Sequence, residues 1–295
     1  MKIVRYIAIL LLFAGSLSGQ HSTLTSNYLF NTFAINPAYA GQKKALDVTM
    51  YYRKQWAGFN GAPQTISLLS SMEIKPKNLS VGLQYDNDKI GLTNTNSIKV
   101  AVAYRVKLNN KHTISFGLQP AYKRIYYDFS KIITTYEGDA AFVASSPAIN
   151  LFNSGAGVYY YSKKLFFGLS SPELVKTKSG TKFYEFNAIG GVIIKLKDNV
   201  TLKPSFLVRQ IKNSPVQFDL NCTAYFNDVL GVGVAYRNKD AIVAYFDFSV
   251  NKKFKFGYAY DYSIGPLRRY NSGTHEIMLN YFFGKFTEAP TPRYF

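Results

Sequence analysis

The chain has 295 residues, of which 47% are hydrophobic and 16% aromatic, and its formal charge is +18 at pH 7. Beyond Gly19 no run of about 18 apolar residues occurs, which excludes a protein that crosses the membrane with helices. The only cysteine, Cys222, cannot form an intrachain disulfide. Two classes remain: a soluble β-rich secreted protein, and an outer-membrane barrel, whose signal is a series of alternating segments about ten residues long.

Residues 1–19 have the three parts of a signal peptide: a basic start with Lys2 and Arg5, an apolar core, and small residues up to Gly19. The apolar core is too short to span a membrane. We therefore expect cleavage at this point and export of the mature chain. Loss of Lys2 and Arg5 lowers the formal charge from +18 to +16.

The positive charge indicates an anionic partner. For an exported chain the candidates are lipopolysaccharide, acidic surface polymers or an acidic protein, and we expect no nucleic acid. The lysines are scattered among turn sequences rather than gathered in one block, so a solvated basic rim is the other interpretation.

The segment Leu29–Gly41, "LFNTFAINPAYAG", is the least polar stretch before the first alternating segment. Pro37 fixes its own φ and moves Asn36 out of the helical region, so this point forms a corner that the Asn36 side chain can cap. Two interpretations remain open. The segment is a lead-in to the first strand, or it is a plug that hides side chains such as Phe33 and Ile35 in the mouth of a barrel.

The segment 97–108, "SIKVAVAYRVKL", shows the clearest period of two, which is typical of a strand. One face is apolar and the other is small or cationic. Segments 46–53, 216–226 and 254–262 alternate in the same way. A soluble sandwich rarely keeps polar residues opposite an aromatic face over so many strands, so a barrel with a wet lumen fits better. The expected inward polar residues include Lys99, Arg105, Asp219, Asn221 and Asp261.

Counting the alternating segments predicts about fourteen antiparallel strands. The expected strands are 45–57, 63–72, 79–86, 95–107, 113–127, 154–162, 164–171, 182–197, 199–210, 215–226, 229–237, 240–250, 252–263 and 274–285.

The connections between these strands carry independent information. Those after even-numbered strands are short and polar, such as "NNKH", "SKK" and "KDN". Four of those after odd-numbered strands are longer: "NDKIGLTN", residues 129–153, "SPELVKTKSG" and "SIGPLRRYNSG". Outer-membrane barrels have short periplasmic turns and long outer loops, which places both termini in the periplasm.

The motif "YYRKQWAGFNGAPQT" places Arg53, Gln55 and Trp56 at the end of the first strand, followed by a tight loop with Gly61 and Pro63. A tryptophan at a strand end is usually an interfacial anchor, because an indole prefers the headgroup layer.

The motif "YDNDKIGLTNTNS" places Asp86, Asp88 and Lys89 in or beside an outer loop. A calcium site needs more oxygen ligands at defined spacing, so turn chemistry explains these residues better. We expect no metal and no cofactor.

Several motifs follow one another in order over nearly the whole mature chain: "FNTFAINPAYAG", "YRKQWAGFNGAPQT", "VGLQYDNDKIGLTNTNS", "SFGLQPAY", "FNSGAGVYYYSKKLFFGLSSPELV" and "YAYDYSIGPLRRYNSGTHEI". As an ordered set they resemble the PorP/SprF family of outer-membrane proteins of the type IX secretion system.

The resemblance implies a barrel that works with the secretion and gliding machinery and supports secretion or surface anchoring of a large, adhesin-like cargo recognised by its C-terminal domain. It also implies contacts with periplasmic components of the machinery and with outer-membrane lipid or lipopolysaccharide. The loops 129–153 and 263–273 are the expected cargo contacts. The residues that match the family's first two motifs are Asn36, Pro37, Ala38, Tyr39 and Gly41, and Arg53, Gln55, Trp56, Gly61 and Pro63.

The sequence leaves two alternatives to this function. A FadL-like channel for hydrophobic small molecules also has an Asn-Pro-Ala hatch, but the expected inward residues of this chain are polar. An enzyme is disfavoured because His21, His112 and His275 are the only histidines, and neither their spacing nor their neighbours suggest zinc or a Ser/His/Asp arrangement.

The expected organisation is therefore a signal peptide at 1–19 and an N-terminal plug or periplasmic element at 20–44. The all-β outer-membrane barrel follows at 45–285, with a short periplasmic tail at 286–295, because Pro290 and Pro292 cannot continue the last strand.

Overall fold

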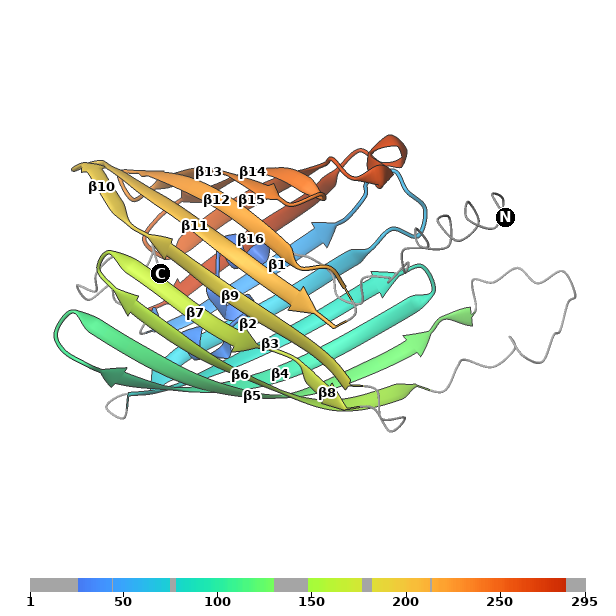
Figure 1. Ribbon diagram of the computed structural model, residues 1–295, viewed down its shortest axis with the longest axis horizontal. Coiled ribbons are helices and arrows are strands. Elements are labelled where there is room, and N and C mark those ends of the chain that lie inside the picture. The colour runs from blue at the N-terminus through green and yellow to red at the C-terminus, as the bar shows by residue number, and fades with distance from the viewer. Residues whose placement is uncertain are drawn as a thin grey trace, which may run out of the picture.

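The computed structural model describes residues 26–43, 45–74, 78–129, 148–176, 182–212 and 214–284. The expected signal peptide and the tail at 286–295 lie outside these residues. Figure 1 shows one twisted antiparallel sheet rolled into a barrel. Its strands are β1 (Leu46–Lys54), β2 (Gln64–Ile74), β3 (Leu79–Ile90), β4 (Thr93–Lys107), β5 (His112–Tyr127), β6 (Ile149–Ser162), β7 (Leu165–Ser171), β8 (Leu174–Lys176), β9 (Lys182–Val192), β10 (Ile194–Lys197), β11 (Val200–Ile211), β12 (Gln217–Phe226), β13 (Leu230–Arg237), β14 (Ala241–Ser249), β15 (Phe254–Ser263) and β16 (Thr274–Phe283).

The sheet closes on itself because β1 pairs with β16 along its whole length, from Leu46 opposite Phe283 to Lys54 opposite His275. Segment β8 continues β7 beyond Pro172, and β10 continues β9 beyond Ile193. The sixteen segments therefore form fourteen strands of the barrel wall, in agreement with the predicted strand number. Among the described residues, no helix is long and apolar enough to cross a membrane.

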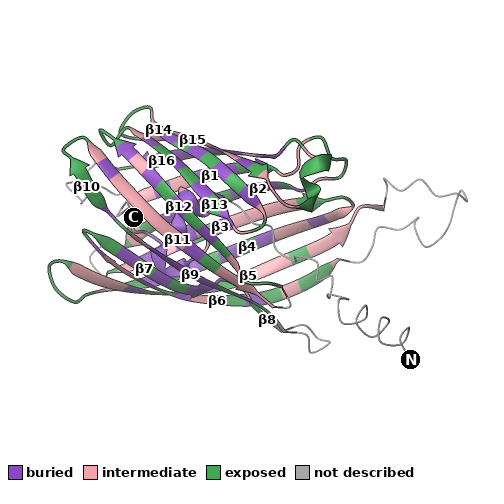
Figure 2. Cartoon of the chain, turned by 45° about the horizontal axis from the view of Figure 1, so that its top comes forward, coloured by how far each residue is buried: buried purple, intermediate pink, exposed green. Residues whose placement is uncertain are grey.

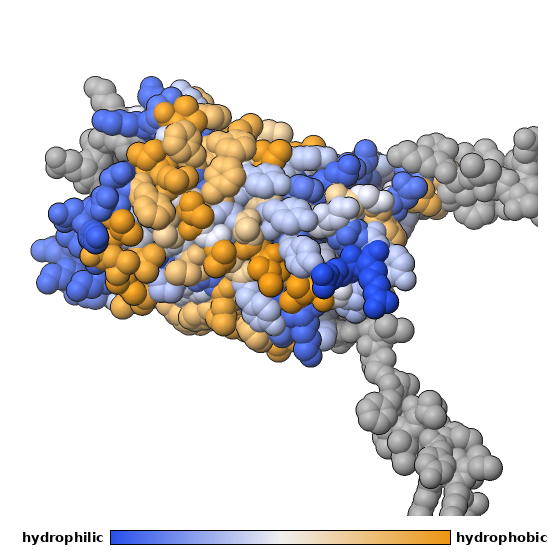
Figure 3. Space-filling view, turned by 90° about the horizontal axis from the view of Figure 1, so that it is seen from above, coloured by the Kyte–Doolittle hydropathy of each residue, from blue (hydrophilic) through white to orange (hydrophobic). Residues whose placement is uncertain are grey.

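Burial alternates along the strands as the sequence predicts. In β4 the inward Lys99, Ala101 and Ala103 are buried, while the outward Val100 and Val102 are nearly half exposed. The banding in Figure 2 shows the same alternation in neighbouring strands. Figure 3 shows apolar side chains gathered on the outer wall and hydrophilic side chains toward both ends, as a lipid-facing belt requires.

The two ends of the barrel differ in their connections. We call "turn end" the end at which β1 begins, on the left of Figure 1, and "loop end" the end at which β1 finishes. The turn end has short connections such as 163–164 and 198–199. The loop end has longer ones, including 55–63, 128–148 and 264–273, the last containing the short helix η5 (Pro266–Tyr270).

Several boundary predictions were wrong, among them that of the first strand, which was expected to reach residue 57 but ends at Lys54. The expected loop "NDKIGLTN" is a turn of only two residues, Gly91 and Leu92, because β3 and β4 pair up to Ile90 and Thr93. Strand β6 begins at Ile149, where a loop was expected, and pairs with β5 from that residue on. The expected loop after Ser171 contains a further strand segment, β8. Polar residues at the ends of these strands resemble loop sequence, although their backbones pair with a neighbouring strand.

Residues 26–41, which we call the plug, lie inside the barrel. They form three short 3-10 helices, η1 (Asn27–Leu29), η2 (Thr32–Ala34) and η3 (Pro37–Tyr39). The plug runs from Ser26, beside Glu276 at the loop end, to Gly41, beside Ser80 at the turn end. It therefore spans most of the lumen lengthwise before the chain enters β1.

Candidate functional site

Glycines on the inner wall form the seat of the plug. A Cβ at Gly117 of β5 would lie 2.3 Å from the backbone nitrogen of Ala38. A Cβ at Gly157 of β6 would lie 2.2 Å from the Asn36 side chain, and one at Gly168 of β7 would lie 2.8 Å from the same side chain. Real Cβ atoms do not approach other atoms this closely. Glycine at these positions therefore allows the plug backbone to touch the wall.

Asn36 is completely buried and joins the plug to the wall. Its Oδ1 accepts a hydrogen bond of 3.0 Å from the backbone N–H of Ala38, which caps η3 as the sequence predicts. Its Nδ2 donates to the backbone carbonyls of Val158 at 3.1 Å and Leu169 at 3.4 Å. One side chain thus fixes both the corner at Pro37 and the position of this corner against β6 and β7.

Other contacts hold the second half of the plug, from Ile35 to Ala40. The Arg105 guanidinium donates a hydrogen bond of 2.6 Å to the carbonyl of Ala40, and the Ser170 hydroxyl donates one of 2.7 Å to the carbonyl of Ile35. Tyr39 packs edge-to-face on Tyr159 with ring centroids 5.3 Å apart. Burial raises the pKa of the Tyr39 hydroxyl, so this residue stays neutral.

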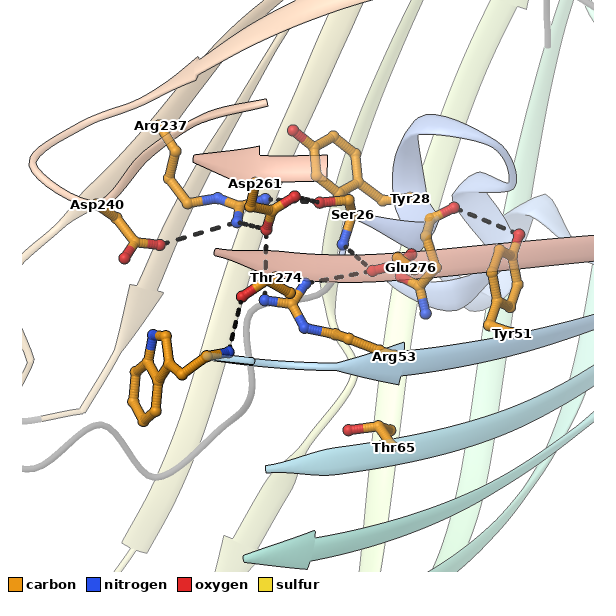
Figure 4. A network of polar contacts seen from close by, with 12 residues as sticks. Ser26, Tyr28, Tyr51, Arg53, Thr65, Arg237, Asp240, Asp261, Thr274 and Glu276 are labelled. Carbon is orange, nitrogen blue, oxygen red and sulfur yellow. Dashed lines mark hydrogen bonds and ion pairs between the residues drawn. The ribbon is translucent and has the colours of Figure 1, made fainter. Parts of the chain in front are cut away.

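A buried charge network fills the loop-end lumen on the side of β12–β16 and β1 (Figure 4). Arg237 has no exposed surface and bridges Asp219 through Nε at 3.1 Å and Asp261 through NH1 at 3.0 Å. Arg53 contacts Glu276 at 3.2 Å and Asp261 at 3.4 Å. Two guanidinium groups therefore neutralise most of the charge of three carboxylates inside the barrel.

The first described residue of the plug belongs to this network. The Ser26 backbone N–H donates to Glu276 at 3.0 Å, and its hydroxyl donates to Asp261 at 3.1 Å. The Tyr28 hydroxyl donates to Asp219 at 2.8 Å, and burial raises its pKa, which keeps it a neutral donor. At the rim, burial also raises the pKa of Asp240, which lies 3.8 Å from Arg237.

The opposite side of the loop-end lumen holds a polar cavity of about 220 Å³, which we call the chamber. Plug residues including Tyr28 and Ile35 form its floor. Three ion pairs lie along its walls: Lys99–Asp86 at 3.2 Å, Lys123–Glu173 at 2.7 Å and Arg209–Glu185 at 2.8 Å. Such a chamber holds water or hydrophilic groups, but it offers no continuous apolar path.

The residues of the first two sequence motifs occupy two places. Asn36, Pro37, Ala38, Tyr39 and Gly41 lie in the plug, and Arg53 points inward into the charge network. Gln55, Trp56, Gly61 and Pro63 lie in the connection after β1, where the Trp56 backbone N–H donates to Thr274 at 3.2 Å. The structure therefore brings the plug motif and Arg53 into one lumen, while Trp56 and Gly61 stay at its loop-end rim.

Asp86, Asp88 and Lys89 were expected in or beside a loop, but they lie within β3. Asp86 and Asp88 line the chamber, and Asp88 accepts a hydrogen bond of 2.7 Å from the Thr65 hydroxyl. Lys89 points outward and is exposed. Among the described residues, no group of three His, Cys, Asp or Glu side chains could hold a metal ion.

Sequence reasoning missed Ser26, Arg237 and Glu276 as members of the network. Strand parity could have identified Glu276, because it lies on the same face as inward Thr274 and Met278. Arg237 was expected as the last residue of the strand 229–237 and is the last residue of β13, but its inward direction was not recognised. No local pattern marks Ser26, since its partners lie more than two hundred residues away.

A closed antiparallel barrel with an apolar outer belt and a polar lumen defines the class of outer-membrane β-barrels, since only such a wall pairs every strand within lipid. Residues 17–281 match the type IX secretion system membrane protein family PorP/SprF, and the chain belongs to this family. No curated protein matches the chain.

Solved structures with a similar fold include the CymD monoaromatic hydrocarbon channel, with a TM-score of 0.53 and 9% identity over 92% of this chain and 96% of that chain. The Ralstonia pickettii toluene transporter TbuX has a TM-score of 0.51 and 9% identity over 84% of this chain and 92% of that chain. A Pseudomonas aeruginosa FadL homologue has a TM-score of 0.50 and 10% identity over 84% of this chain and 93% of that chain. At such identities the similarity concerns the fold alone.

We predict that Gly117→Ala destabilises the barrel, because the new methyl group meets the plug backbone, which cannot move aside. Overpacking of this kind costs about 1–3 kcal/mol. Gly82→Ala is the matched comparison, since its methyl group meets only the ring of Phe33 at 2.4 Å, and a ring can tilt. Thermal unfolding followed by circular dichroism should show the larger loss for Gly117→Ala; equal melting temperatures would argue against a rigid seat.

We predict that Arg237→Met removes the guanidinium partner of Asp219 and one of the two guanidinium partners of Asp261, and lowers the free energy of unfolding by about 3–5 kcal/mol. Arg209→Met removes the ion pair with Glu185, but this carboxylate borders the polar chamber and keeps its hydrogen bond from Asn187, so the substitution should cost less. Adding Asp219→Asn to Arg237→Met should recover part of the loss, because one unpaired charge disappears. Urea unfolding in lipid vesicles measures all three variants, and a cost for Arg209→Met as large as that for Arg237→Met would contradict the assignment.

Proposed function

We propose that this barrel is a non-enzymatic accessory protein of the type IX secretion and gliding machinery. It supports secretion or surface anchoring of one large, adhesin-like cargo, whose C-terminal domain docks at the loop end. The observation that carries this proposal, beside family membership, is the seated plug: the lumen is occupied along most of its length, so the barrel serves as a docking body and not as the conduit for the cargo.

The orientation follows from the two kinds of connection. Short turns face the periplasm in outer-membrane barrels, so the turn end meets periplasmic components of the machinery and the loop end meets the cell surface. Gly284, the last described residue, leaves β16 at the turn end, which supports a periplasmic C-terminal tail. Ser26 lies in the loop-end lumen, and the residues before it lie outside the described part of the chain, so a periplasmic N-terminus stays a prediction.

The loop 264–273 offers the best-defined surface for cargo. Its helix η5 exposes Arg268 and Arg269 beside Leu267 and Tyr270, the last with 69% of its surface exposed. The Arg268 guanidinium also lies 5.0 Å from the centroid of the Tyr262 ring. Exposed arginine and tyrosine side chains are the residue types that most often anchor protein interfaces. Most of the other expected cargo loop, residues 130–147, lies outside the described residues.

The experiment is copurification of the tagged mature protein from outer membranes in mild detergent, read by mass spectrometry, together with secretion of the cargo in a deletion strain. We predict that Arg268→Glu with Arg269→Glu lowers recovery of the exported cargo at least tenfold, as expected for loss of an interface anchor. Lys163→Glu with Lys164→Glu, an equally exposed pair at the turn end, should leave cargo recovery unchanged. Normal secretion in the deletion strain would refute the proposal.

The alternative is a FadL-like channel for hydrophobic small molecules, which the fold of the CymD and TbuX structures favours. The chamber argues against it, because its walls carry three ion pairs and plug residues also line it. We predict that planar bilayers containing the purified protein show no stable conductance, and that the protein retains no apolar molecule after extraction. Steady single-channel currents or a bound hydrocarbon would instead support the channel.

A further inference from the structure

The turn end has a cavity that the docking role does not use. It measures about 500 Å³ and lies between the β12–β13 connection at 227–229, the β14–β15 connection at 250–253, and Lys43, which joins the plug to β1. Its volume is within the range of about 300–1,000 Å³ that is typical of pockets for small ligands. We call it the rim pocket.

The walls of the rim pocket are mainly apolar. Phe282 contributes on the lumen side and is almost fully buried, whereas Phe254 alternates along β15 with inward Lys255 and belongs to the outer face. Val229, Phe248 and Val250 also line it, with 41%, 42% and 55% of their surfaces exposed. Phe248 alternates along β14 with the inward Asp247, so it belongs to the outer face. The pocket is thus continuous with the belt that lipid tails cover.

The remaining walls are strongly basic. Lys43, Lys252, Lys253 and Lys255 line the pocket, against a single carboxylate, Asp228. Lys43 is held by Asp47 at 2.9 Å, and Lys255 lies 3.8 Å from Asp247. Lys252 and Lys253 are exposed on the tip of the turn. Two exposed ammonium groups therefore stand at the barrel rim, where phospholipid headgroups begin.

We propose that the rim pocket binds one anionic glycerophospholipid. Its phosphate and acidic headgroup lie at Lys252 and Lys253, and one acyl chain follows Phe248 and Val250 into the apolar part of the pocket. An acidic peptide would match the lysines equally well. The continuity with the lipid-facing belt favours a lipid, because a peptide would have to displace lipid tails from Phe248 and Val250 to reach the same wall.

Binding would also brace the plug. Lys43 lines the pocket and lies in the connection between the plug and β1. Its ammonium group is held there by Asp47, the second residue of β1. A bound headgroup would fill the space beside this connection. The inference rests on the proposed orientation, because the turn end must lie in the phospholipid leaflet. It does not depend on whether the barrel binds a cargo protein.

The test is native mass spectrometry of the purified barrel, titrated in detergent with phosphatidylglycerol or with phosphatidylcholine of identical acyl chains. We expect phosphatidylglycerol to bind at least tenfold more tightly, because its net charge meets two lysines in a partly dehydrated site. Lys252→Gln with Lys253→Gln should abolish most of this preference. Lys163→Gln with Lys164→Gln, the matched lysine pair in another turn at the same end, should keep it within about twofold, as is usual for distant surface charges.

Two further probes separate the possible ligands. Glycerol 3-phosphate, which has the phosphate but no acyl chain, should not compete with phosphatidylglycerol, and Val250→Ser should weaken binding of the lipid. The proposal would be overturned in favour of general surface electrostatics if both double-lysine variants lost the preference for phosphatidylglycerol equally. Binding of phosphatidylcholine as tight as that of phosphatidylglycerol would overturn it in the same way. Displacement of the lipid by a short glutamate-rich peptide carrying phenylalanine would overturn it in favour of a protein ligand. None of these results bears on cargo recovery.

Discussion

The structure depends on one constraint: within lipid, every backbone N–H and C=O group of the wall must be paired by another strand. The chain meets this constraint by pairing β1 with β16 over nine residues, which leaves the closed wall without a free edge. Closure in turn sets the character of each face. Outward positions must be apolar, and inward positions must find polar partners or be covered by another part of the chain.

A barrel of fourteen strands is too wide for its own inward side chains to fill. In this chain, sixteen residues of the N-terminal region fill the lumen. The plug does not rest on top of the inward side chains. It replaces them, because the wall carries glycine where the plug comes closest, at Gly117, Gly157 and Gly168. The three adjacent strands β5, β6 and β7 thus lack side chains where one segment of the plug touches them. Wall and plug therefore pack as a single body.

Much of this architecture could be predicted from sequence, because strand alternation and short turns are local signals. The parity of Lys99, Arg105 and Asp261 was predicted correctly, and so was the corner at Asn36–Pro37. The seat could not be predicted, because a glycine in a strand shows only that something approaches and not what approaches. The network of Ser26 with Glu276 was inaccessible for a related reason: it joins residues 250 positions apart, and only closure of the barrel brings them together.

The distribution of charge inside the barrel bears on whether the plug could leave. Removing it would expose the Asp219, Asp261 and Glu276 carboxylates, which now accept hydrogen bonds from Ser26 and Tyr28, and would leave an empty groove along the glycine seat. Arg237 and Arg53 would still pair with these carboxylates, but the hydrogen bonds from the plug would be lost, and the empty groove adds the cost of a cavity. The plug is therefore held by the same buried network and the same glycine seat that shape the lumen, and we infer that the packed body of wall and plug stays together rather than opening as a pore.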